Sequence, residues 1–163
     1  MTELGSLIQR HGANGLLIDS NLFLLYLIGN TNEQRIPKFD RTQRYTIQEF
    51  RLLARLVAQF RRVITTPHIL TEVSSLARLD GAELRKMRAK FHEVAQTTSE
   101  FYEESRSITG GPLFAKFGLT DAAIEVASRK PMLVLTDDLP LYLTLRHRGV
   151  DAINFNHIRT YAW

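Results

Sequence analysis

Short apolar runs alternate with longer amphipathic segments along this chain. The runs at 16–18 and 63–65 are largely apolar and end in turn-forming or helix-capping residues, which is typical of buried strands. Between 46 and 60, apolar residues recur every three or four positions, as on one face of a helix. The pattern predicts strands at 16–18, 63–65, 132–136 and 151–155, and helices at 22–28, 46–60, 68–79, 81–106, 120–129 and 140–148.

Strands that alternate with helices predict an α/β fold. We expect a three-layer α/β/α sandwich with a mainly parallel central sheet. The length of 163 residues, without a repeat or a linker, fits one domain over 1–163. Residues 29–44 are polar and contain Gly, Asn and Pro, so we expect a surface loop there. The helix at 81–106 is long for such a domain, and its apolar stripe serves either core packing or a seam with a second copy of the chain.

Composition narrows the class of protein. The chain has no cysteine, which excludes a disulfide framework, a zinc finger and a cysteine nucleophile. The longest apolar stretch, 22–28, is too short to span a bilayer, and the first residues lack the pattern of a signal peptide. We therefore expect a cytoplasmic protein with no membrane segment. The net charge of +4 permits nucleic acid as a partner without establishing it.

Acidic residues follow the ends of predicted strands. Asp19 comes after the first strand, and Asp137 and Asp138 follow the strand at 132–136. Glu72 lies beside the apolar face of the helix after the second strand, and Asp121 opens a later helix. Because ligands of open parallel sheets bind beyond the carboxyl ends of the strands, these side chains are candidates for one site.

Each acid also has an ordinary structural explanation. Asp19 and Asp138 suit helix caps, Asp121 suits a helix N-terminus, and Glu72 suits the border of a buried stripe. As a group, however, they would repel one another unless a divalent cation neutralised them. Oxygen-only ligands favour Mg²⁺ or Mn²⁺, ions that hold phosphates and activate water.

The segments around these acids resemble the PIN-domain nuclease family. The likeness rests on LLIDSN at 16–21, TTPHILTEVSSL at 65–76, LTDAAIEVAS at 119–128 and LVLTDDLPLY at 133–142, and it extends over 16–155. It implies an α/β/α nuclease whose acidic pocket binds one or two Mg²⁺ or Mn²⁺ ions and hydrolyses RNA. The first biological role it implies is the toxin of a toxin–antitoxin pair, similar to the VapC group, with an antitoxin protein as partner. An RNA processing or decay nuclease is the alternative.

The resemblance also assigns roles to individual residues. By position in the family's motifs, the catalytic metal ligands are Asp19, Glu72, Asp121 and Asp138, with Asp137 as an auxiliary ligand. Ser20 and Thr136 would orient the carboxylates. The segments at 29–44 and 81–106 make this chain longer than the compact toxins.

Two other classes of function compete with the nuclease. A haloacid-dehalogenase-like phosphatase would use Asp19, Thr65 or Thr66, Lys130 and the Asp137–Asp138 pair. That family usually has Asp-x-Asp at its first site, where this chain has Asp-Ser-Asn, and it leaves Glu72 and Asp121 unused. A PIN-like binding module without activity would usually lack some of the acids, all of which are present here.

Basic residues suggest where RNA would lie. The spacing of Arg44, Arg51, Arg55 and Arg62 aligns them on one face if a single helix carries all four. They either contact RNA phosphates or form a solvated helix face. A second basic cluster lies at 78–90. The five histidines are scattered without ligand spacing, and we expect them to be non-catalytic.

Overall fold

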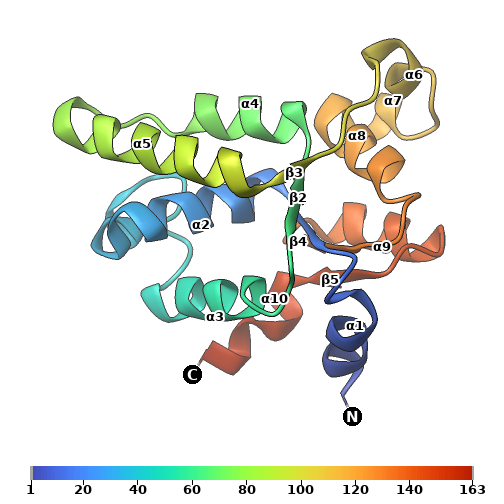
Figure 1. Ribbon diagram of the computed structural model, residues 1–163, viewed down its shortest axis with the longest axis horizontal. Coiled ribbons are helices and arrows are strands. Elements are labelled where there is room, and N and C mark those ends of the chain that lie inside the picture. Colours follow the sequence, from blue (N-terminus) through green and yellow to red (C-terminus); the bar gives the residue numbers. More distant parts are fainter. Residues whose placement is uncertain (1, 163) are drawn as a thin grey trace.

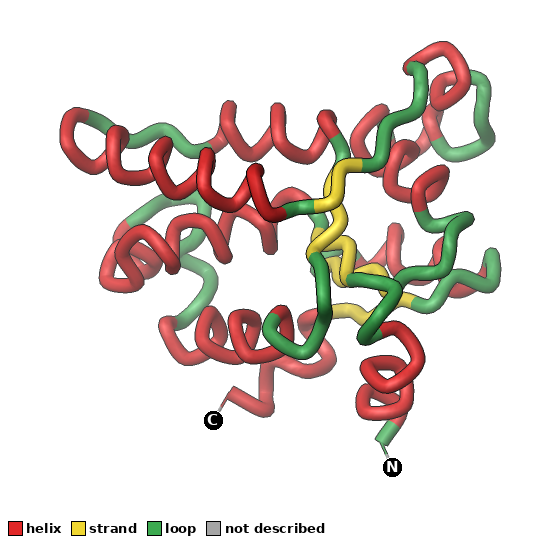
Figure 2. The backbone as a smooth tube through the Cα atoms, in the orientation of Figure 1, coloured by secondary structure: helices red, strands yellow, loops and turns green. Residues whose placement is uncertain are grey.

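The computed structural model of the chain describes residues 2–162 and is built around a parallel sheet. Within those residues, five parallel strands form one sheet in the order β3-β2-β1-β4-β5 (Figure 1). Figure 2 shows the short strands at the centre with helices on both sides, which confirms the predicted three-layer α/β/α sandwich. The strands are β1 (Leu16–Ile18), β2 (Val63–Thr65), β3 (Ser99–Glu100), β4 (Leu133–Thr136) and β5 (Ala152–Asn154).

Helices make up most of the remaining chain. In Figure 1, α2, α3 and α5 lie on one side of the sheet, and α8 and α9 lie on the other. None of the described helices is both long and apolar enough to cross a membrane. The helical elements are α1 (Glu3–His11), α2 (Ser20–Asn32), η1 (Glu33–Lys38), α3 (Ile47–Val57), α4 (Pro67–Leu76), α5 (Gly81–Thr97), α6 (Ser105–Thr109), α7 (Phe114–Phe117), α8 (Leu119–Ala127), α9 (Leu139–His147), α10 (Phe155–Ile158) and η2 (Arg159–Ala162).

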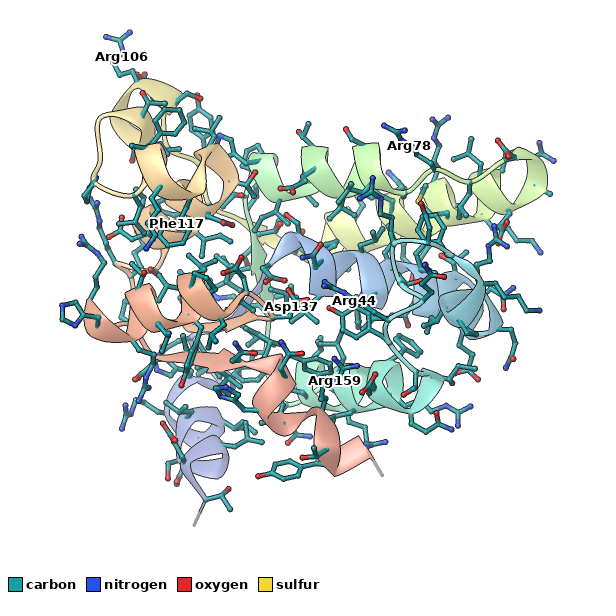
Figure 3. The ribbon with its side chains drawn as sticks, turned by 180° about the vertical axis from the view of Figure 1, so that it is seen from behind. Arg44, Arg78, Arg106, Phe117, Asp137 and Arg159 are labelled. Carbon is teal, nitrogen blue, oxygen red and sulfur yellow. The ribbon has the colours of Figure 1, made fainter. Side chains whose placement is uncertain are left out.

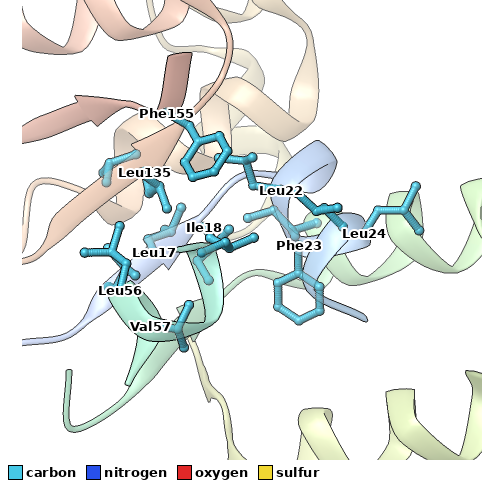
Figure 4. Packing of buried hydrophobic residues seen from close by; sticks show 14 of the residues in the cluster. Leu17, Ile18, Leu22, Phe23, Leu24, Leu56, Val57, Leu135 and Phe155 are labelled. Atoms are coloured by element: carbon cyan, nitrogen blue, oxygen red, sulfur yellow. The ribbon is translucent and has the colours of Figure 1, made fainter. Parts of the chain in front are cut away.

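The two central strands carry the core of the molecule. Every residue of β1, and Leu133 to Leu135 of β4, is fully buried, because helices cover both faces of the sheet. Leu17 and Ile18 pack with Leu22 and Phe23 of α2 in the hydrophobic cluster of Figure 4. In the register of the two strands, Ile18 pairs with Leu135, which brings the residues after β1 beside those after β4.

The expected surface loop at 29–44 is wrong in large part. Helix α2 continues to Asn32, and η1 follows it directly. Ile36 and Phe39 are buried, and the Thr42 hydroxyl donates to the Ile36 carbonyl at 2.9 Å. Two apolar side chains therefore anchor a segment whose composition is otherwise that of a loop.

The predicted helix at 81–106 ends early, at Thr97. The hydroxyls of Thr97 and Thr98 donate to the carbonyls of Val94 and Ala95 at 3.0 and 3.2 Å, which satisfies acceptors at the end of the helix. The next residues form β3, which pairs with β2 and was not predicted. The predicted helix at 46–60 is also shorter, because α3 ends at Val57.

We predict that Gly29→Ala destabilises the protein through the contact between α2 and α3. A methyl group at Gly29 would lie 2.2 Å from the ring of Phe50, so one of the two helices must shift. Overpacking of this kind costs about 1–3 kcal/mol of unfolding free energy, which urea denaturation measures. Gly110→Ala is the matched control, because its nearest contact would be an ordinary 3.4 Å. Equal stability of the two variants would contradict the prediction.

Candidate functional site

Asp19 is the most enclosed of the candidate acids. It follows β1 and caps α2, with its Oδ1 atom accepting from the Leu22 amide at 3.1 Å. Its Oδ2 atom accepts from the Thr136 hydroxyl and from the Asp137 amide, the latter at 3.1 Å. The carboxyl is therefore fixed between the carboxyl ends of β1 and β4. This is the point where the chain connections of the sheet change direction, and where open α/β sheets bind ligands.

Burial sets the protonation of Asp19. Removal from water raises the pKa of this carboxyl to about 8, and the nearby charge of Asp137 adds to the effect. The hydrogen bonds from Thr136, Leu22 and Asp137 act in the opposite direction and do not outweigh burial. Near neutral pH, Asp19 thus keeps its proton for much of the time.

Asp137 points into a network of basic and aromatic groups. Its carboxylate accepts from Asn21 at 3.3 Å, and from Arg44 and the Tyr45 hydroxyl (Figure 3). Burial and the Asp137 charge raise the pKa of Tyr45, so its hydroxyl stays a donor. Asn156 donates to the Asp137 carbonyl at 2.9 Å. Arg44 neutralises this carboxylate, which separates Asp137 from the other candidate acids.

The C-terminal segment braces this network. The Arg159 guanidinium donates to both oxygens of Glu49 at 2.6 and 2.9 Å, and to the Arg44 carbonyl at 2.9 Å. It also lies 5.3 Å from the centre of the Tyr45 ring. Glu49 is buried and forms a capping box with Thr46 at the start of α3. Residues after β5 therefore hold the turn that contains Arg44.

The other three acids lie together on the neighbouring side of the same edge. Ser20 donates to Glu72 at 3.0 Å, and Asp138 caps α9 by accepting from the Leu141 amide at 2.8 Å. Asp121 is half-buried in the first turn of α8. Burial raises the pKa of Asp121 to about 6, and the charges of Asp138 and Glu72 contribute. These mutual effects show that the three carboxylates share one electrostatic environment.

A cleft opens beside these acids. It has a volume of about 480 Å³ and lies between α4 on one wall and the α7–α8 segment on the other. Glu72 and Asp121 line it from the two walls, together with His68, Thr71 and Phe117. Sequence reasoning missed these last three residues. The spacing of His68 and Glu72, four residues apart on α4, was the available signal for a shared helix face.

The donor set fits a hard divalent cation in chemistry more than in spacing. All four acids offer oxygen, the ligand that Mg²⁺ and Mn²⁺ prefer, and none of them forms an ion pair in the described part of the chain. Across residues 2–162, no three His, Asp or Glu side chains lie close enough to hold an ion. A cation would therefore have to draw the exposed side chains of Glu72 and Asp138 inward, or bind through water.

The four arginines do not form the predicted row. Helix α3 carries only Arg51 and Arg55, and Arg51 pairs with Glu33 at 2.6 Å. Arg44 lies in the preceding turn against Asp137, at the acidic edge. Arg62 precedes β2, where its Nε atom donates to the Asn14 carbonyl at 2.9 Å, so it lies at the opposite edge of the sheet. One helix face shared by all four is wrong, because the helix ends before Arg62 and begins after Arg44.

No family model, curated protein or solved structure matches this chain in our comparisons. The functional argument therefore rests on the geometry described above.

We predict that stability in EDTA depends on pH through Asp19. Its pKa is higher in the folded than in the unfolded chain, so the stabilisation is complete below about pH 4 and is lost as the pH rises through about 8. Asp19→Asn removes this titration. The unfolding free energy of the variant, relative to the natural chain, should rise by more than about 1.4 kcal/mol between about pH 5 and about pH 8.5. Asp40→Asn, an exposed change away from these hydrogen bonds, is the control. A constant difference across this range would refute the assignment.

Proposed function

We propose that this protein is a metal-dependent nuclease that hydrolyses RNA phosphodiester bonds, in the manner of the PIN domains that its motifs resemble. One observation carries the proposal. Four carboxylates from distant parts of the chain, Asp19, Glu72, Asp121 and Asp138, lie at one edge of the sheet and have no basic partner among the described residues. Elsewhere in the protein, buried acids such as Glu49 and Glu125 are paired with arginine.

Mg²⁺ or Mn²⁺ is the cofactor that this arrangement favours. Asp19, Glu72, Asp121 and Asp138 would hold it, and the ion would supply an activated water and neutralise charge on the phosphate. The Oδ1 atom of Asp19 accepts one hydrogen bond and keeps a second lone pair for a ligand. Thr136 holds the Asp19 carboxyl in place, and Ser20 holds that of Glu72. Asp137 contributes less, because Arg44 already neutralises it.

Two observations disfavour the phosphatase alternative. Its covalent mechanism needs an ionised Asp19 as nucleophile, whereas burial raises the pKa of this carboxyl to about 8. It also needs a lysine near Asp19. Lys130 lies before β4, in a hollow with Arg62 and Met132, and therefore at the opposite edge of the parallel sheet.

RNA binding has two remaining arginine candidates on α3. Arg55 is exposed and Arg51 is more than half exposed, although Glu33 competes with phosphate for Arg51. In the toxin role, an antitoxin protein would be the partner and would be encoded beside this chain. A neighbouring reading frame for a short DNA-binding protein that relieves growth arrest by this chain would support that role. Its absence would favour RNA processing or decay.

We predict that Asp19→Asn, Glu72→Gln, Asp121→Asn and Asp138→Asn each reduce Mg²⁺- or Mn²⁺-dependent RNA cleavage by more than about 100-fold, because each removes a charge that holds the ion. The readout is kcat/KM on a single-stranded RNA. Without metal, the variants should melt no lower than the natural chain, since each change relieves repulsion or desolvation. Asp80→Asn is the control, because its exposed side chain makes no capping hydrogen bond. Full activity of the Asp19 and Asp138 variants would end the nuclease proposal.

A further inference from the structure

The walls of the cleft present groups that the metal chemistry does not use. Phe117 lines it from the α7–α8 side, and His68 lines it from α4, one helical turn before Glu72. The volume of about 480 Å³ falls in the usual range of small-ligand sites, about 300–1,000 Å³. An aromatic ring and an imidazole therefore lie on opposite walls of a cleft whose rim holds Glu72 and Asp121.

His68 places a hydrogen-bond donor in this cleft. Its Nδ1 atom is buried and has no hydrogen-bond partner among residues 2–162. A buried N–H without a partner is rarer than a buried acceptor without one, so the ring proton belongs on Nε2. The Nε2 edge is the part of the ring left to face the cleft. A neutral donor between two carboxylates suits a neutral ligand with acceptor atoms.

Phe117 is held firmly in its wall. Its half-buried ring packs against both hydrophobic clusters of the protein. The Lys116 ammonium lies 5.0 Å from the centre of that ring. Gly118 follows with a φ of +84°, and a Cβ there would meet open space, so the backbone beside the ring is uncrowded. A fixed ring with an adjacent cation is the combination that binds unpaired bases and their phosphates.

We propose that Phe117 and His68 bind the base of a nucleotide adjacent to the scissile phosphate, which makes single-stranded RNA the substrate. The base stacks on Phe117, the Nε2–H group of His68 donates to a base acceptor, and Lys116 contacts a phosphate. A paired base in a duplex cannot enter the cleft. This inference rests on the proposed nuclease function and assigns the substrate class of the same site.

The test compares a base removed from the RNA with a ring removed from the protein. The natural chain cleaves matched single-stranded RNAs that carry a normal or an abasic nucleotide at each position next to the cleavage site. At one position, loss of the base should reduce kcat/KM by about 10-fold, within the range for one stacked base. Phe117→Leu should cause a similar loss on normal RNA and little further loss on abasic RNA, because both changes remove the same contact.

Two control variants separate the parts of the subsite. Phe114→Leu lies on the same helix outside the cleft and should leave both reactions unchanged. His68→Phe keeps a ring and removes the donor, so it should alter the ranking of the four bases at that position. A Phe117→Leu variant that loses the same factor on normal and abasic RNA would overturn the proposal, as would equal cleavage of duplex RNA.

A binding measurement keeps this proposal separate from the nuclease proposal. RNA that carries 2-aminopurine, a base whose fluorescence falls on stacking, is titrated with the natural chain in EDTA. Quenching that Phe117→Leu reduces and Phe114→Leu preserves would support the base subsite even if no RNA were cleaved. RNA cleavage without such quenching would leave the nuclease standing and overturn the subsite.

Discussion

The buried Asp19 carboxyl is the constraint around which this edge of the molecule is arranged. It links three elements, since it caps α2, follows β1, and accepts from the Thr136 hydroxyl and the Asp137 amide after β4. The pairing of β1 with β4 brings these groups together, and α2 starts in the direction that this cap sets. Ser20, the first residue of α2, then holds Glu72 on α4. A single fixed carboxyl thus determines where the acids of two further helices lie.

Much of the fold was predictable because its central strands are buried on both faces. Such strands appear in sequence as continuous apolar runs, and β1, β2, β4 and β5 were found in this way. Strand β3 was missed because Ser99 and Glu100 are polar residues at an exposed edge, where only the main chain pairs. The segment at 29–44 was misjudged because two buried side chains, Ile36 and Phe39, outweigh a polar composition.

The candidate site divides in the same way. The acids after strands were predictable, because parallel strands bring their carboxyl ends to one edge. The partners of Asp137 were not, since Arg44 and Tyr45 are more than ninety residues away in sequence and meet it only through tertiary packing. The cleft walls were hidden for a similar reason. Phe117 belongs to a short helix whose position depends on a separate hydrophobic cluster, and neither has a distinct sequence pattern.

The brace formed by Asn156 and Arg159 bears on how the protein matures during synthesis. A ribosome-bound chain folded only as far as β5 would contain every strand of the sheet and all the carboxylates discussed above. It would still lack the donor to the Asp137 carbonyl and the guanidinium that joins Glu49 to the turn at Arg44. Glu49 would then be a carboxylate without its ion-pair partner, at a position that is buried in the finished fold. The edge that carries the acids is therefore completed only when the residues after β5 leave the ribosome, which delays its full assembly until after the sheet has formed.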